Sequence, residues 1–353
     1  MSVALAPGHT RRPSLARVIT VLAIATAVIA IAALMVGAAT LSPARVLAAL
    51  GRGLGLELEG SHRDDIIVCT LRLPRVVLAL AVGAALASAG ALLQGLVRNP
   101  LADPGLLGVT NGAALAAVAF LVLGDGLLVA APGALRPYVL PLCAFGGALV
   151  ATAVVVSLAR VLGRGAAADL VLIGVGVAAL CGAATGLLLF VATDAQLRSV
   201  TFWTLGSLGG AGWDVVVPVA VATALAIALA AVRASSLDRL LLGDAEARHL
   251  GVDVRRLTAQ VAVVVALAIG AAVAVCGVIG FIGLVVPHLL RAWVGPGHRA
   301  LVPASALGGA ALLTAADAVA RTIVAPAELP VGIVTALVGA PVLIAIARTR
   351  SAA

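Results

Sequence analysis

The chain has 353 residues, of which 63% are hydrophobic and only 11% are charged, and its mean hydropathy is +1.20. These values exclude an ordinary soluble globular protein and indicate a polytopic membrane protein. The net charge of +8 does not indicate nucleic-acid binding, because the arginines flank apolar segments and aromatic residues make up only 3%.

Long apolar runs in chain order predict ten membrane-spanning helices. The first run follows three arginines and is too long for the core of a signal peptide, so we expect it to be an uncleaved first span. Residues 257–294 are too many for one crossing, and Gly280, Gly283 and Pro287 interrupt them, so we divide this stretch into two spans. The predicted spans lie near residues 18–40, 73–97, 106–123, 137–162, 169–192, 214–232, 258–281, 282–294, 300–320 and 329–347.

The distribution of arginine supports ten spans. With the N-terminus in the cytoplasm, fifteen arginines fall in cytoplasmic segments and eight fall outside, which follows the positive-inside rule. Nine spans would place the last two arginines on the outer side. We therefore predict an all-α, multi-pass protein of the cytoplasmic membrane with both termini in the cytoplasm.

A short internal repeat suggests how the helices are arranged. Residues 79–90, ALAVGAALASAG, match residues 266–277, ALAIGAAVAVCG, at eight of twelve positions. In the ten-span topology the first copy runs inward and the second runs outward, as an inverted repeat of two five-helix halves requires. We expect a single transmembrane domain over residues 1–353, with halves at about 15–195 and 196–348.

The polar stretch 233–256 carries five arginines and four carboxylates between two predicted spans. We interpret it as a water-facing platform made of two short helices, near 237–242 and 245–250. Asp244 is predicted to cap the second helix, with Glu246 in its first turn. An ordinary basic cytoplasmic loop is the alternative reading.

Several kinds of chemistry have no support in the sequence. There is no phosphate-binding loop motif and no lysine anywhere, so any ATP must be hydrolysed by a partner. Asp317 is the one ionisable residue that lies clearly within an apolar span, and its spacing of four from Arg321 favours a helix ion pair over a proton relay. No nucleophile and base pair, and no spacing of His or Cys, predicts an enzyme or a metal site.

Four longer strings are specific enough to compare with known families. They are RLPRVVLALAVGAALASAGALLQGLVRNPLADPGLLGVTNGAAL (72–115), LLGDAEARHLGVDV (241–254), GFIGLVVPHLLR (280–291) and ADAVARTIVAPAELPVGIVTALVGAPV (316–342). These strings resemble the FecCD family, the membrane permeases of bacterial ABC importers for ferric siderophores, haem and vitamin B12. The resemblance covers nearly the whole chain from about residue 15.

The resemblance implies a permease subunit in the bacterial inner membrane. Its expected partners are a cytoplasmic ABC ATPase, a periplasmic or lipid-anchored substrate-binding protein, and a second permease copy, identical or related. It implies no cofactor on this chain, since ATP and magnesium would bind the ATPase. Some strings are similar to haem permeases, so we expect haem before ferric siderophore, with vitamin B12 open. An ion-coupled secondary carrier and a non-transporting scaffold remain alternatives from other classes.

The resemblance also implies roles for particular residues. The family's second gate often carries small hydroxyl residues, whereas this chain has Ala166, Ala167 and Ala168 there, which puts a polar role in doubt. Membrane-interface positions are the alternative for the outer arginines and the aromatic residues. The implied sites are ATPase coupling at Gly243, Asp244, Glu246, Arg248 and Gly251, binding-protein docking at Arg72, Arg75 and Arg321, and the gate or pathway at Asn99, Pro100, Leu101, Phe202 and Trp203.

Overall fold

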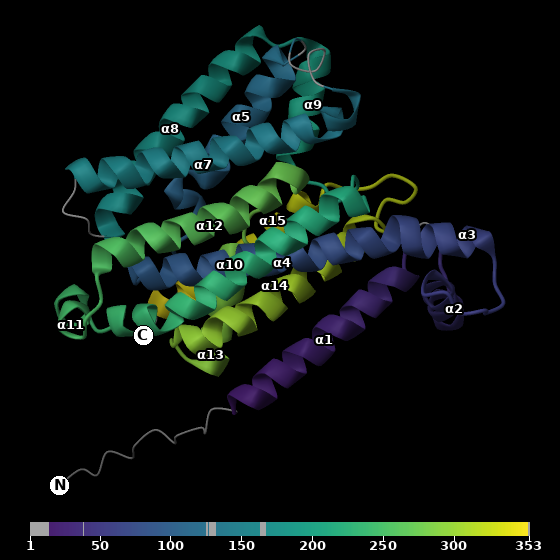
Figure 1. The fold of residues 1–353 in the computed structure, drawn as a ribbon, viewed down its shortest axis with the longest axis horizontal. Coiled ribbons are helices and arrows are strands. Elements are labelled where there is room, and N and C mark those ends of the chain that lie inside the picture. Colours follow the sequence, from purple (N-terminus) through teal and green to yellow (C-terminus); the bar gives the residue numbers. More distant parts are fainter. Residues whose placement is uncertain (1–13, 38, 125, 127–131, 163–166, 352–353) are drawn as a thin grey trace.

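The computed structural model describes residues 14–37, 39–124, 126, 132–162 and 167–351. Within these ranges the protein is built from helices and contains no strand, which confirms the predicted all-α class (Figure 1). Ten apolar helices correspond to the ten predicted spans. They are α1 (Leu15–Met35), α4 (Leu73–Val97), α5 (Val109–Leu123), α7 (Arg136–Leu162), α8 (Ala167–Val191), α10 (Trp213–Leu240), α12 (Val254–Cys276), α13 (Ile282–Val294), α14 (His298–Ala320) and α15 (Val331–Ser351).

Length and composition separate these helices into two groups. Seven lie in apolar stretches long enough to cross a membrane, whereas α5, α13 and the segment Val331–Ala345 of α15 are shorter apolar helices. The most apolar windows of α4 and α12 are 78% buried, whereas those of α1, α7, α8 and α10 are 22–28% buried. Figure 1 shows α4 in the middle of the bundle, where it contacts α10, α12, α13 and α14. The bundle is therefore organised around α4 and α12, and the outer helices present apolar side chains to lipid.

Two of the main helix contacts recur in the order that the predicted inverted repeat requires. When α1, α4, α5, α7 and α8 are matched in order to α10, α12, α13, α14 and α15, each of these two contacts has a counterpart. The pair α4 and α14 corresponds to α12 and α7, and the pair α5 and α7 corresponds to α13 and α14. A second repeat supports the match: residues 144–153 in α7 and 306–315 in α14 are identical at six of ten positions.

Glycine allows the closest of these contacts. A Cβ atom at Gly83 of α4 would overlap the carbonyl oxygen of Gly309 in α14. Its repeat counterpart, Gly270 of α12, lies against Phe145 of α7, where an added Cβ would be 3.2 Å from the ring. Small residues let membrane helices approach closely where lipid provides no hydrophobic driving force. The backbones of α4 and α14 therefore approach very closely, whereas an aromatic ring lies between α12 and α7 at the corresponding position.

The stretch 257–294 is divided as predicted, but not by all the expected residues. The break between α12 and α13 runs from Gly277, with φ of 69°, to Phe281, with φ of 70°. Gly280 lies within the break. The prediction was wrong for Gly283 and Pro287, which lie inside α13, because neighbouring helices and small local adjustments let a membrane helix accommodate glycine and proline.

The polar platform 233–256 contains one short separate helix instead of two. The predicted helix near 237–242 is the end of α10, whose buried face continues through Ala234, Leu237 and Leu240 at a spacing of three. The second predicted helix is α11 (Asp244–His249), with Glu246 in its first turn as expected. Asp244 does not cap it: Gly243 is the N-cap and no side chain accepts a capping hydrogen bond.

The segment between α1 and α4 is more ordered than its polar composition indicated. It forms α2 (Pro43–Gly53), α3 (His62–Asp65) and a π-helical stretch, Ile66–Arg72, that runs into α4. Ion pairs of 2.6 Å join Arg45 to Asp64 and Arg52 to Asp65. The hydrogen bond from Arg45 to the Asp64 carboxylate raises the pKa of Arg45 above its usual value. These bonds hold α2 against the start of the second span.

Candidate functional site

The end of α4 turns sharply into the predicted gate. Arg98 adopts a left-handed conformation, with φ of 53°, and the amide of Asn99 donates to the carbonyl of Gln94. The side-chain oxygen of Asn99 then accepts from the amide of Leu101 at 3.0 Å, on the far side of Pro100. Asn99, Pro100 and Leu101 therefore form one compact turn at the end of the central helix.

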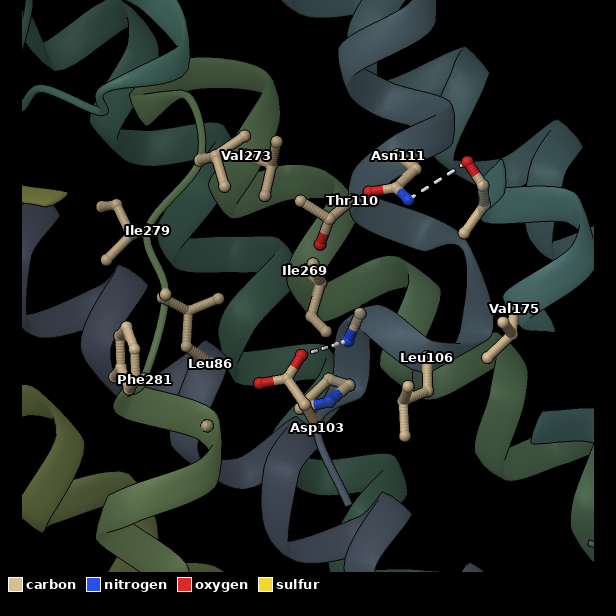
Figure 2. A pocket seen from close by; sticks show the side chains of 16 residues that line it. Leu86, Asp103, Leu106, Thr110, Asn111, Val175, Ile269, Val273, Ile279 and Phe281 are labelled. Atoms are coloured by element: carbon tan, nitrogen blue, oxygen red, sulfur yellow. Dashed lines mark hydrogen bonds between the residues drawn. The ribbon is translucent and has the colours of Figure 1, made fainter. Parts of the chain in front are cut away.

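A cavity of about 420 Å³ lies beyond this turn (Figure 2). One wall carries Asp103, Thr110 and Asn111, and the opposite wall is apolar and includes Ile279 and Phe281. The carboxylate of Asp103 accepts from the amide of Gly105 at 2.7 Å, which starts the short 3₁₀ helix η2 (Pro104–Leu107). The cavity is bounded by α4, η2, α5, α8, α12 and the break before α13. Its mixed lining suits a solute with both polar and apolar parts.

The platform helix α11 is anchored to the bundle at its base. Gly243 has φ of 116°, a conformation that favours glycine, and Gly251 at the other end has φ of 79°. Ala247 is fully buried against the bundle, while Glu246 and Arg248 are exposed. The helix thus presents charged side chains to water from a fixed base.

The platform contacts the gate turn directly. A guanidinium nitrogen of Arg98 lies 2.9 Å from a carboxylate oxygen of Asp244. Arg98 immediately precedes Asn99, so this ion pair joins the first turn of α11 to the turn that ends α4. Sequence reasoning assigned both neighbourhoods separately and did not anticipate the bond between them.

The three arginines predicted for the outer face all form hydrogen bonds with other groups of this chain. Arg75 makes a two-oxygen contact with Asp317 at 2.9–3.0 Å and also pairs with Glu328 at 2.8 Å. The expected pair of Asp317 and Arg321 is present at 3.5 Å, and Asp317 is 2% exposed. Arg75 is the nearer partner of Asp317, which links α4 to α14.

The other two guanidinium groups bind the end of α1. Arg72 donates to the carbonyls of Leu34, Met35 and Ala39, and Arg321 donates to the carbonyl of Ala33. The last carbonyls of a helix lack partners within the helix and attract cations. Both arginines are only 6% exposed. A structural role in holding α1 therefore accounts for their position, and docking stays a prediction.

The predicted aromatic residues lie in α9 (Asp194–Thr204), but only one is open. The side chain of Phe202 is 67% exposed, whereas Trp203 is partly buried and packs against the main core. Ala166 of the second predicted gate lies outside the described residues, and Ala167 and Ala168 begin α8.

Sequence reasoning missed a buried polar contact inside the bundle. The amide of Gln94 in α4 donates to the carbonyl of Leu284 at 3.1 Å, and its oxygen accepts from Arg291 at 3.1 Å. An amide side chain in a long apolar helix is itself a signal of such an interhelical bond. It ties α4 to α13 close to the gate turn.

Comparison with known proteins identifies the family. The FecCD transport family matches residues 24–349. The chain belongs to the FecCD transport family. It is 48% identical over 275 residues to the hemin transport system permease protein HmuU of Yersinia pestis, covering 77% of this chain and 80% of that protein.

Permeases for another cargo are also similar. The cobalamin import system permease protein BtuC of Halobacterium salinarum is 42% identical over 286 residues, covering 81% of this chain and 74% of that protein. The vitamin B12 import system permease protein BtuC of Salmonella typhimurium is 41% identical over 290 residues, covering 80% and 84%.

A solved structure extends the likeness to the fold. An inward-facing ABC transporter of the metal-chelate type superimposes with a TM-score of 0.80 at 28% identity, covering 95% of this chain and 99% of that one. The FecCD protein described here is therefore a transporter subunit and not an enzyme: it is the permease of an ABC importer and a multi-pass protein of the inner membrane. An importer of this kind works with ATPase subunits, a substrate-binding protein and a second permease copy.

Proposed function

We propose that this permease carries an iron chelate across the inner membrane, with haem as the first candidate and a ferric siderophore next. The observation that carries the proposal is the 48% identity to a hemin permease over 80% of its length, against 42% and 41% for two cobalamin permeases. The exposed ring of Phe202 supports it, because a flat macrocycle stacks on an aromatic face.

The proposed route passes the 420 Å³ cavity and then the turn at Asn99, Pro100 and Leu101. The cavity has the polar side chains of Asp103 and Asn111 opposite the ring of Phe281, which supports passage of a ligand that combines polar groups with a large apolar surface. The gate turn would open when the ion pair of Arg98 and Asp244 transmits a movement of α11.

The proposed partners bind at separate faces of the permease. A cytoplasmic ABC ATPase binds α11 through Glu246 and Arg248, with Gly243 and Gly251 fixing the helix ends, and holds the ATP and magnesium. This chain binds no cofactor of its own. A periplasmic or lipid-anchored binding protein approaches the outer face near Arg75, whose Glu328 partner is 47% exposed and can exchange for a carboxylate of another protein. A second copy, identical or related, completes the pathway.

Substrate competition tests the cargo. Proteoliposomes that contain the permease with its ATPase and binding protein are given radioactive haem, cyanocobalamin or a ferric siderophore. ATP is supplied on the side of the membrane where the ATPase lies. We expect ATP-dependent uptake of haem that excess cyanocobalamin does not inhibit. Uptake of cyanocobalamin with no uptake of haem would contradict the proposal.

Vitamin B12 is the second candidate, because the two BtuC proteins match nearly as much of the chain as HmuU does. Phe202→Ala tests the stacking contact. Loss of the ring should lower the affinity for haem by about 0.5–1.5 kcal/mol, the range for an aromatic pair, and Phe190→Ala, at an exposed ring on α8, is the matched control.

A further inference from the structure

Hollows that are not part of the proposed transport route lie along the contact between α7 and α12. At one end, a crevice of about 360 Å³ is lined by Leu149, Ala153 and Val263, all at least partly open to the membrane, together with Arg160. A small adjoining cleft shares Arg160 with this crevice and adds Arg255. An apolar groove within two membrane-spanning helices thus ends at two arginines.

These two arginines are available to a ligand. Both side chains are exposed, and neither has an ion pair or hydrogen bond to any residue in the described part of the chain. The hydroxyls of Thr152 and Thr258, on the same walls, donate to Ala148 and Val254 and keep acceptor capacity. The predicted topology places this end in the cytoplasmic leaflet, where anionic lipids attract basic groups.

The hollow at the opposite end of the contact between α7 and α12 differs in its polar groups. There a hollow of about 540 Å³ between α7, α10 and α12 is equally apolar but has no arginine in its lining, and its polar mouth is formed by Tyr138 and Asp214, joined by a hydrogen bond of 3.1 Å. Phe145 against Gly270 lies between the two hollows. Of these two hollows, the inner crevice is the one that combines an apolar lining with positive charge.

We propose that the inner crevice binds one anionic phospholipid, with its phosphate between Arg160 and Arg255 and an acyl chain along Leu149 and Val263. The apolar lining of the groove within two spans and the charge at its end match the two parts of such a lipid. This inference does not depend on the cargo proposed above. It concerns the lipid face of the permease, away from the cavity.

Native mass spectrometry of the full-length chain tests the site. The protein in mild detergent is titrated with dioleoyl phosphatidylglycerol or dioleoyl phosphatidylcholine. The wild type should retain the anionic lipid preferentially, and Arg160→Ala with Arg255→Ala should weaken it roughly 30-fold, at about 1 kcal/mol per arginine. Removing Arg233 and Arg256 instead deletes the same charge outside the crevice and should leave retention unchanged.

Two further variants examine the acyl chain. Ala153→Phe fills the open wall of the inner crevice and should weaken both lipids, whereas Ala222→Phe fills the outer hollow and should leave the preference for phosphatidylglycerol intact. Several outcomes would overturn the proposal: equal retention of the two lipids, equal loss in the control double variant, displacement by millimolar glycerol phosphate alone, or crosslinking of Ala153→Cys to a second permease copy or to the ATPase.

Discussion

Arg98 and Asp244 lie 2.9 Å apart and join the gate turn at the end of α4 to the first turn of the platform helix α11. The two side chains are 40% and 28% exposed, so the pair contributes at most about 1 kcal/mol to stability. In the proposed mechanism the importance of the pair is its position, because it is a contact through which a movement of α11 reaches the turn.

Charge reversal separates coupling from folding at this pair. Arg98→Glu or Asp244→Arg alone should lower the substrate transported per ATP hydrolysed by at least about tenfold, while the melting temperature of the purified protein changes little. The double reversal restores the attraction and should recover most of the ratio. Transport that is equally poor in the double variant and in both single variants would show that the ion pair is not the coupling contact.

The two carboxylates that hold Arg75 should differ in their effect on stability. Asp317 is buried, so Asp317→Asn removes the buried carboxylate that faces the Arg75 guanidinium and should cost about 3–5 kcal/mol of unfolding free energy. Glu328→Gln is the matched control, and since Glu328 is 47% exposed it should cost at most about 1 kcal/mol. Thermal unfolding in detergent measures both, and equal losses would contradict this account of Arg75.

Arg72 distinguishes a structural role from docking. Arg72→Met keeps most of the side-chain volume but removes the guanidinium that donates to the carbonyls at the end of α1, which should cost about 1–3 kcal/mol for each buried group left unsatisfied. Arg63→Met, at an exposed arginine of the same segment, should not change the melting temperature. An unchanged melting temperature for Arg72→Met, with weaker affinity for the binding protein, would restore the docking role.

The contact of α4 with α14 predicts different tolerance among glycines. Gly83→Ala places a methyl group against the Gly309 backbone and should cost about 1–3 kcal/mol or more, since the backbone must shift. Gly182→Ala in α8 meets nothing within 4 Å and should be neutral within about 0.5 kcal/mol. The folded fraction recovered in detergent measures the difference, and equal recovery of the two variants would contradict the close helix approach.

The spans were predictable because apolar length is a strong constraint in a membrane, and the start of α4 and its end were placed at the observed residues. The helix α2 was missed although Ser42 and Pro43 form a recognisable helix start, because helices were predicted mainly from long apolar runs. The division near Phe281 was predicted, but the left-handed conformation of Phe281 was not, because this conformation is rare for phenylalanine.

The candidate site was predictable only in part. Resemblance located the gate turn and the platform, since both are contiguous strings. The burial of Arg72 and Arg321 could not be foreseen, because their partners are carbonyls of α1, 33 to 288 residues away. The bond between Arg98 and Asp244 likewise joins residues that only the folded bundle brings together.

Energy coupling tests the central claim most directly. The measurement is the initial rate of haem uptake into proteoliposomes that hold the permease with its ATPase and binding protein, with no ion gradient and with either ATP or ADP supplied. We predict uptake with ATP, none with ADP, and none with ATP when the ATPase is inactivated. Uptake driven by an imposed ion gradient in the absence of nucleotide would contradict the account and assign the chain to the secondary carriers.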